Sequence, residues 1–327
     1  MVVQDAPDPA APSQDQVLVR VRACGLNRGE LNYAAIMTSG EPAINGAEFA
    51  GEVVEVGPGV TRWRKGDRVM GVPFAHGRNA QAQLVLAHEL TLMRIPDRLS
   101  FTDAAAFPVV YMTAHDAVVT NGELKAGESV LVNGASGGVA VAAIQIASLL
   151  GAKPVFATSR SSAKLERLKA FGATELIDVT KESQLERVMA ATDKKQSNSY
   201  AQIQEQVGGV DIIIDTIGAS VFDENLRSLA VKGRLVIVGR LGGSVAQIDL
   251  THLWYKRLKL IGVTFQTRSP QERLDLIQAC ARDMLPLLEA RRVNLGVDRV
   301  FPMEQVNEAY AYMCLDQHVG KIVITID

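Results

Sequence analysis

From about residue 110 onward, short apolar runs rich in β-branched residues alternate with stretches of helical character. The runs are mostly apolar on both faces, as strands buried between two layers of helices must be. Glycine follows several of the helical stretches, at Gly151, Gly172 and Gly233. Six such units in succession predict an α/β fold with a doubly wound parallel sheet. The six runs are SVLVN (129–133), PVFAT (154–158), ELID (175–178), VDIIID (210–215), GRLVIVG (233–239) and LKLIGVT (258–264).

The stretch VLVNGASGGVAVAAIQIASLLG (130–151) places its smallest residues where a predicted strand ends and a helix begins. A helix N-terminus directs unpaired N–H groups and a positive dipole at an anion such as the pyrophosphate of a dinucleotide, and a Cβ in the turn would hold that anion away. The spacing G-x-G-x-x-G/A is met with alanine as its first member, by Ala135, Gly137 and Ala140. A plain tight turn is the alternative. The residues predicted to contact the cofactor here are Gly134, Ala135, Ser136, Gly137, Gly138 and Val139.

The end of the second run bears on which dinucleotide binds. NAD sites usually carry Asp or Glu about 20 residues after the glycines to accept from the ribose 2′-hydroxyl, whereas a 2′-phosphate requires donors and positive charge. The segment TSRSSAK (158–164) contains no acid but has hydroxyls, an arginine and a lysine. We therefore predict NADPH, with Ser159, Arg160 and Lys164 as contacts. A solvated loop before a basic helical turn is the alternative.

The first hundred residues have a different sequence pattern, which is typical of short strands and turns. In QVLVRVRAC, Val17, Val19 and Val21 fall on one face, the period of two expected of a half-buried strand. After about residue 268 a helical segment leads to a final strand, KIVITI, which is expected to pack back on the first domain.

Composition restricts the class of protein. Hydrophobic residues make up 47% and charged residues 21% of the chain, as in soluble globular proteins. The net charge of −2 creates no positive electrostatic field that would attract nucleic acid or anionic lipid. Three scattered cysteines argue against a disulfide framework and against a closed zinc site. No apolar run reaches about 18 residues, and we do not expect the acidic, Pro- and Ala-rich opening segment to act as a signal peptide. We expect a soluble cytoplasmic protein with a small-molecule substrate and no membrane or nucleic-acid partner.

Six segments follow one another along the chain: CGLNRGEL (24–31), GAEFAGEVVEVG (46–57), KAGESVLVNGASGGV (125–139), DTIG (215–218), RLVIVG (234–239) and GKIVITI (320–326). In this order they resemble the medium-chain dehydrogenase/reductase superfamily, and most closely its zinc-independent quinone oxidoreductase and enoyl reductase branch. The resemblance implies a GroES-like β-rich catalytic domain (1–109), a Rossmann NADPH-binding domain (110–266) and a C-terminal segment that completes the catalytic domain (267–327).

The resemblance also bears on zinc. Zinc-dependent members bind the catalytic metal with a cysteine, the histidine of a G-H-E segment and a third residue. This chain keeps Cys24, but Ala47 stands where the histidine should be. An open catalytic zinc site needs three protein ligands, so we predict no metal and a packed thiol at Cys24. His76, His88 and His115 lack ligand spacing and are expected to be surface or hydrogen-bonded histidines.

Without a metal, alcohol oxidation lacks the Lewis acid that stabilises an alkoxide. Hydride transfer to a quinone or an α,β-unsaturated carbonyl requires only orientation, donors for the developing enolate oxygen and a proton. The resemblance places Asn27 in the nicotinamide pocket, Glu30 where relatives often have Asp, and Tyr33 near a pocket tyrosine. Asn27 and Tyr33 are chemically able to donate to an enolate. Glu30 as a hydrogen-bonding residue of a domain hinge and Tyr33 as core packing are the alternatives.

Further cofactor contacts are expected at the carboxyl ends of the later strands, where open α/β sheets bind ligands. Thr113 matches a family segment beside the nicotinamide phosphate, and Lys321 is expected to close over the nicotinamide. The loop residues are Thr216, Gly218, Val238, Gly239, Arg240, Thr264 and Phe265.

Two other functions stay open: reduction of an enoyl thioester, and a non-catalytic NADPH-binding structural or sensor protein. The resemblance further implies a homodimer, because family members pair through the last Rossmann strand. Here that strand is LKLIGVT, an apolar edge that pairing would cover.

Overall fold

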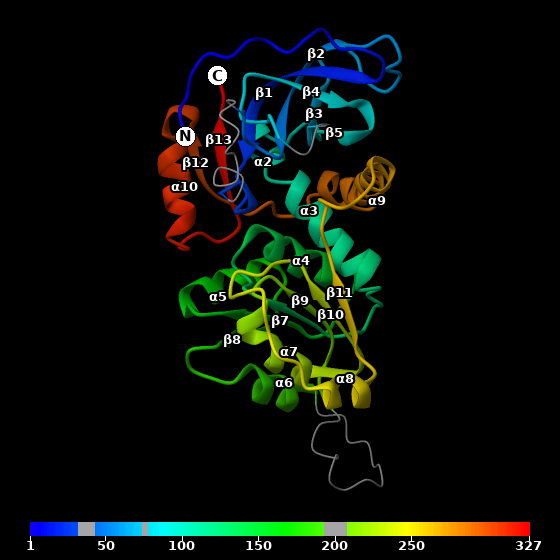
Figure 1. Ribbon diagram of the computed structural model, residues 1–327, viewed down its shortest axis with the longest axis vertical. Coiled ribbons are helices and arrows are strands. Elements are labelled where there is room, and N and C mark those ends of the chain that lie inside the picture. The colour runs from blue at the N-terminus through cyan, green and yellow to red at the C-terminus, as the bar shows by residue number, and fades with distance from the viewer. Residues whose placement is uncertain (32–42, 74–77, 193–207) are drawn as a thin grey trace, which may run out of the picture. The chain divides into compact units, whose positions relative to one another are not determined.

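The computed structural model describes residues 1–31, 43–73, 78–192 and 208–327, and the chain divides into two compact units (Figure 1). Unit 1 comprises Met1–Met112 and Gln266–Asp327, and unit 2 comprises Thr113–Phe265. The first boundary falls inside α3 (Pro108–His115).

Unit 2 is built on a six-stranded parallel sheet, as the alternating apolar runs predict. Its strand order is β11-β10-β9-β6-β7-β8, and every neighbouring pair is parallel. The order runs outward in both directions from β6, which is the doubly wound Rossmann arrangement with its switch point between β6 and β9. The strands are β6 (Val130–Asn133), β7 (Val155–Ser159), β8 (Glu175–Asp178), β9 (Val210–Asp215), β10 (Leu229–Ile237) and β11 (Lys259–Gly262).

The helices of unit 2 pack closely on this sheet where their residues are small. In α4, every residue from Ala140 to Ala147 is buried. The positive φ angles of Gly151 (85°) and Gly172 (104°) confirm the predicted ends of two helical stretches. The helices are α4 (Gly138–Leu149), α5 (Ser162–Leu168), α6 (Gln184–Thr192), α7 (Phe222–Ser228) and α8 (Leu250–Lys256).

Two expectations for this unit were wrong. Gly233 does not end a helix, because α7 already ends at Ser228 and Gly233 lies inside β10, in an irregular stretch between Leu229 and Arg234, which both pair with β9 and override the weak helical pattern of LAVK. Strand β11 is not buried on both faces. It lies at the end of the strand order, and Leu260 is 38% exposed.

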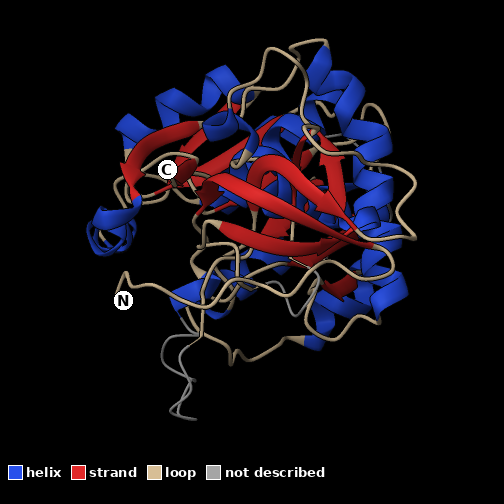
Figure 2. Cartoon of the chain, turned by 90° about the horizontal axis from the view of Figure 1, so that it is seen from above, coloured by secondary structure: helices blue, strands red, loops and turns tan. Residues whose placement is uncertain are grey.

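Unit 1 contains a seven-stranded sheet of order β12-β13-β1-β2-β3-β5, with β4 paired to β1. Strand β13 pairs parallel with β12 and antiparallel with β1, so the C-terminal segment supplies strands to the sheet of the N-terminal segment. Figure 2 distinguishes helices, strands and loops. The strands are β1 (Gln16–Gly25), β2 (Phe49–Val56), β3 (Arg68–Gly71), β4 (Leu84–His88), β5 (Leu92–Arg94), β12 (Val297–Pro302) and β13 (Lys321–Thr325), and the helices are α2 (Phe101–Ala104), α9 (Pro270–Glu289) and α10 (Val306–Cys314).

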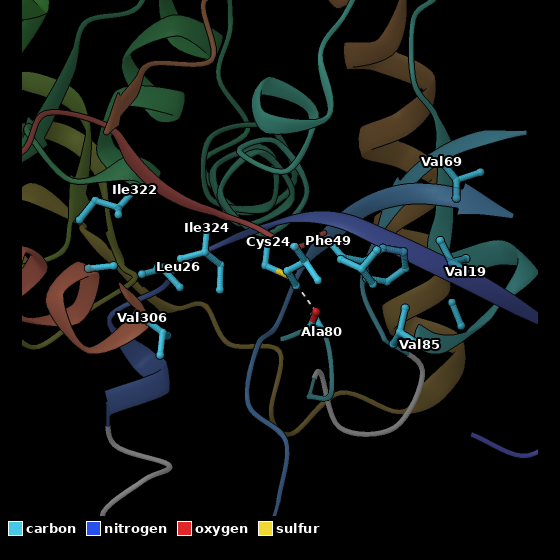
Figure 3. Close-up of a cluster of buried hydrophobic side chains, with 14 of the residues drawn as sticks. Val19, Cys24, Leu26, Phe49, Val69, Ala80, Val85, Val306, Ile322 and Ile324 are labelled. Carbon is cyan, nitrogen blue, oxygen red and sulfur yellow. Dashed lines mark hydrogen bonds between the residues drawn. The ribbon is translucent and has the colours of Figure 1, made fainter. Parts of the chain in front are cut away.

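The core of unit 1 joins the first and last parts of the sequence. Val17, Val19 and Val21 are buried, as their alternation predicts. They belong to one cluster with Ile322 and Ile324 of β13, which Figure 3 shows in part. None of the helices among the described residues is both long and apolar enough to cross a membrane.

Candidate functional site

The predicted cofactor loops of unit 2 follow strands that are all parallel, so the loops lie at one edge of the sheet. The turn after β6 requires glycine at its first position. Gly134 has a φ of 63°, and a Cβ on it would lie 2.6 Å from Thr216 Oγ1 and 2.7 Å from Ile217 Cδ1. The loops after β6 and β9 are therefore in direct contact.

The N-terminus of α4 has the character of an anion site. Its N-cap residue is Gly137, which provides no side-chain cap, and its first turn carries no acidic residue. A Cβ on Gly137 would find only Gly134 O, at 3.9 Å. A twelve-residue helix thus begins with no side-chain cap, no acid in its first turn and space beside its N-cap residue, an arrangement that fits a pyrophosphate.

The loop after β9 is held by a buried carboxylate. Asp215 is fully buried and accepts hydrogen bonds from the backbone N–H groups of Ile217 (2.7 Å) and Gly218 (3.1 Å). Burial raises the pKa of Asp215, although these hydrogen bonds act in the opposite direction. Its backbone oxygen accepts from Val238 N and Gly239 N, so the same residue also fixes the start of the loop after β10.

The loops after β9 and β10 line one pocket of about 370 Å³. Three residues predicted to contact the cofactor, Gly218, Gly239 and Arg240, line it together with Phe222 and Ile237. Sequence reasoning placed these loops at the same edge but did not identify the apolar wall.

At the end of β7, Ser159 Oγ accepts from Ser161 N at 3.2 Å, and Arg160 is exposed. The segment 158–164 contains no acidic residue, but the structure places an acidic residue from the next strand beside it. Asp178, at the end of β8, accepts from Ser162 Oγ and forms an ion pair with Lys181 at 3.4 Å. Hydrogen bonds from Ser162 and Thr180 hold the pKa of Asp178 well below its usual range.

The other residues predicted to contact the cofactor are at the beginning and at the end of the sequence of unit 2. Thr113 is in α3, and Thr264 and Phe265 follow β11. The structure does not test their contacts, which stay predictions.

Unit 1 holds Asn27 and Glu30 in a buried polar cluster just after β1. The amide of Asn27 donates through Nδ2 to Glu48 Oε1 (2.8 Å) and Glu30 Oε1 (3.3 Å), and its Oδ1 accepts from Lys321 Nζ (3.0 Å). The amide nitrogen also lies 3.4 Å from Gly25 O, so its two protons have three acceptors within the protein, and donation to a substrate oxygen would require the amide to leave one of them. Tyr33 lies outside the described residues.

Glu30 is a buried carboxylate surrounded by donors. The hydroxyl of Tyr310 donates to its Oε2 at 2.5 Å, and the N–H of Ala47 donates to its Oε1 at 3.0 Å. Burial nevertheless raises the pKa of Glu30. Burial, together with the charge of Glu30, also raises the pKa of Tyr310, so the phenol stays protonated.

Glu48 and Lys321 form a fully buried ion pair with an Nζ to Oε1 distance of 2.5 Å and side-chain exposures of 0% and 3%. The ammonium also donates to Leu26 O (2.6 Å) and Asn27 Oδ1, so three acceptors surround its three protons. Lys321 was predicted to contact the cofactor. The structure shows its ammonium paired with Glu48, and the contact with the cofactor stays a prediction.

Sequence reasoning missed Glu48, Tyr310 and Gln81, whose Nε2 donates to Tyr310 Oη at 2.7 Å. For Glu48 a signal was present, since a single acid inside the apolar stretch of GAEFAG is typical of a paired, buried carboxylate. Nothing local marks Tyr310 or Gln81.

The region around Cys24 has the contacts of a packed thiol. The Cys24 thiol is buried and donates to Ala80 O at 2.6 Å (Figure 3), and burial raises its pKa. Among the described residues, no group of three or more His, Cys, Asp or Glu side chains is arranged to hold a metal ion. His88 Nδ1 accepts from Leu90 N at 3.1 Å, which confirms a hydrogen-bonded histidine, and His76 lies outside the described residues.

Comparison with known proteins matches both units to families. Residues 13–97 match the alcohol dehydrogenase GroES-like domain, and residues 138–282 match the zinc-binding dehydrogenase family. Quinone oxidoreductase-like protein 2 of Mus musculus is 30% identical over 324 residues, which span 98% of this chain and 87% of that protein. Human quinone oxidoreductase is 30% identical over 304 residues, or 91% of this chain and 85% of that protein.

Solved structures share the fold over nearly the whole chain. An NAD-dependent alcohol dehydrogenase is 28% identical with a TM-score of 0.81, covering 99% of this chain and 95% of its own. The CurK enoyl reductase is 25% identical with a TM-score of 0.79 (99% and 94%), and a mycobacterial protein complexed with NADPH is 25% identical with a TM-score of 0.81 (99% and 95%). With a GroES-like unit, a doubly wound unit and relatives of this similarity, the chain belongs to the medium-chain dehydrogenase/reductase superfamily, a family of nicotinamide-dependent oxidoreductases, in its quinone oxidoreductase branch.

Proposed function

We propose that this protein is an NADPH-dependent reductase that transfers hydride to a quinone or an α,β-unsaturated carbonyl without a metal. The observation that carries the proposal is the N-terminus of α4, a helix start without an acidic residue or a capping side chain behind a turn that only glycine can form. Reduced nicotinamide supplies the hydride when the cofactor is bound. The chain supplies binding and orientation through Gly134, Ser136, Gly137 and the loops after β9 and β10.

The proposal that the reaction needs no metal rests on residues of unit 1. Ala47 has no ligand atom in its side chain, and its N–H is used by Glu30. The thiol of Cys24 is buried and donates to Ala80 O, which are the contacts of a packed thiol. We assign the substrate-facing polar groups to Asn27, Glu30 and Tyr33. Elemental analysis that finds stoichiometric zinc in active protein would overturn this assignment.

The preference for NADPH rests on Arg160 and Lys164, and a similar protein is complexed with NADPH. Another similar protein is an NAD-dependent dehydrogenase, and Asp178 lies beside α5, so the choice needs a direct test. The double variant Arg160→Ala/Lys164→Ala is expected to raise the dissociation constant of NADPH by at least about tenfold and to change that of NADH little, as measured by fluorescence titration. The control, Arg167→Ala/Lys169→Ala, removes equal charge from the other end of α5. Equal weakening of both dinucleotides by the first variant would refute phosphate selectivity.

The acceptor is identified by an anaerobic screen of quinones, enones and crotonyl thioesters with NADPH. A second candidate, enoyl-thioester reduction, is favoured by the similarity to the CurK enoyl reductase. Turnover of the thioester above that of quinones would select it. Tight NADPH binding without turnover of any acceptor would instead indicate a structural or sensor protein.

We also propose a homodimer through β11. This strand pairs only with β10 among the described residues, and its Leu260 is exposed. An apolar strand with an open edge is a template for pairing with a second chain. Light scattering at micromolar concentration is expected to give twice the mass of the chain, and a monomer would contradict the proposal.

A further inference from the structure

A chain of buried side-chain hydrogen bonds crosses the sheet of unit 2 just below its carboxyl edge. The hydroxyl of Thr158 donates to Asn133 Oδ1 at 2.9 Å, and Asn133 Nδ2 donates to Asn225 Oδ1 at 2.6 Å. Asn225 Nδ2 then donates to Asp215 Oδ2 at 3.2 Å. The side chains thus link β7, β6, α7 and β9 in a row.

Each strand member of this row is the last or the penultimate residue of its strand, just ahead of a loop assigned to the cofactor. Asn133 is the last residue of β6 and precedes Gly134. Thr158 precedes Ser159, and Asp215 is the last residue of β9 and holds the N–H groups of Ile217 and Gly218. The row therefore connects the bases of three loops that must be in register to hold one ligand.

The row has a fixed direction. Asp215 has only acceptor oxygens when ionised, so Asn225 must turn its amide nitrogen toward it and its oxygen toward Asn133. Asn133 then presents its own oxygen to Thr158. Gln184 of α6 also donates to Asn225 Oδ1, at 3.1 Å. No member can rotate without leaving a buried polar group unpaired.

Burial makes this arrangement costly to disturb. Thr158, Asn133, Asn225 and Asp215 are exposed by 4%, 1%, 0% and 0%. Polar groups buried at this depth destabilise a fold unless every one is satisfied, and a satisfied network specifies a single arrangement. The neighbouring strand residues are apolar, so the fold would need no amides here for packing alone.

We propose that Asn133 and Asn225 are positioning residues for dinucleotide binding, which hold the loops after β6, β7 and β9 in mutual register. The inference rests on the proposed function. Because the row acts on the cofactor only through the loops that it holds, and one carboxylate of the row fixes the N–H groups of Ile217 and Gly218, its loss weakens the binding of both NADPH and NADH.

The test uses Thr158→Val, which removes one hydroxyl at nearly constant volume, and Asn225→Leu, which breaks the row at its centre. Both dissociation constants, for NADPH and for NADH, are expected to rise by on the order of tenfold in each variant, with kcat at saturating cofactor unchanged. Thr158→Ser, which restores the hydroxyl, is expected to recover affinity. Thr158→Val keeps the test decisive if Asn225→Leu fails to fold, as judged by circular dichroism.

The control is Asn121→Leu. Asn121 donates to Asp116 O and Oδ1 in the same unit but belongs to no strand end, so its loss is expected to leave both dissociation constants unchanged. If wild-type protein binds the dinucleotides and folded Thr158→Val binds them equally well, the positioning role is wrong and the proposed function stands. A loss confined to NADPH would also overturn it, because it would indicate a direct phosphate contact. If wild-type protein binds neither dinucleotide, the proposed function itself fails.

Discussion

The buried polar groups of the two units differ in charge. In unit 2 the row from Thr158 to Asp215 passes through neutral groups and ends in a single carboxylate, whose charge is met by backbone N–H groups and one amide. In unit 1 the cluster around Asn27 contains two carboxylates and one ammonium. A neutral row fixes geometry at modest electrostatic cost, whereas the charged cluster is stable only while each charge keeps its partner.

The largest expected effect is that of breaking the ion pair in unit 1. Lys321→Met leaves Glu48 buried and unpaired, which is expected to lower the free energy of unfolding by about 3–5 kcal/mol in urea titrations. The double variant Lys321→Met/Glu48→Gln is expected to recover most of that loss. As a control, Arg22→Met breaks a pair whose side chains are each 39% exposed, with an expected loss below about 1 kcal/mol. Equal losses of unfolding free energy in Lys321→Met and Arg22→Met would contradict the difference expected between a buried and an exposed ion pair.

A charge introduced into unit 2 tests the other half of the comparison. Gly137→Asp has room for its Cβ and adds a carboxylate at the N-cap of α4. Dinucleotide affinity is expected to fall by about 100-fold, while the free energy of unfolding changes by only a few tenths of a kcal/mol, because an N-cap acid suits the helix but repels phosphate. Gly137→Ser supplies a neutral cap as control. Unchanged affinity in calorimetric titration of Gly137→Asp would place the phosphates elsewhere.

The third prediction concerns pH. Tyr310→Phe removes a donor to Glu30, a carboxyl whose pKa burial raises above 4.5. The raised pKa means that the folded state binds the Glu30 proton more tightly than the unfolded state, so ionisation of Glu30 lowers stability as pH rises. Removal of the donor raises that pKa further. The expected loss is about 2 kcal/mol at pH 7, where the carboxylate needs the donor, and less at low pH.

Urea titrations of Tyr310→Phe at several pH values provide the measurement. Tyr312→Phe is the control, because it removes from the same helix a hydroxyl that donates to a partly buried carboxylate of β12, Asp298. A loss for Tyr310→Phe that does not change with pH would mean that the hydroxyl supports packing rather than the charge of Glu30.

The fold of unit 2 was predictable because its signals are local. Strands such as VDIIID are apolar on both faces, and small residues mark the turn into α4. The wrong prediction at Gly233 has the converse reason. The segment LAVK has no decisive pattern of its own, and the pairing of Leu229 and Arg234 with β9 on either side decides its structure.

The cluster of unit 1 was only partly predictable. Asn27 and Glu30 were identified through a resemblance, and their surroundings were not, because Glu48, Tyr310 and Lys321 come from distant parts of the sequence. Charge pairing between such residues is a property of the assembled sheet. The same holds for Asn225, whose place in the row depends on how α7 packs.

The position of β13 between β12 and β1 has a consequence for biosynthesis. Ala23 pairs with Thr325, so the ribosome must add all of the intervening residues, roughly 15–60 s of elongation, before β1 meets this neighbour. Unit 2 is contiguous in sequence and has emerged by then. In the nascent unit 1, by contrast, one edge of β1 is still unpaired, and Glu48 still lacks the ammonium group of Lys321. Nascent chains stalled before Lys321 should therefore be bound by chaperones through their N-terminal segment.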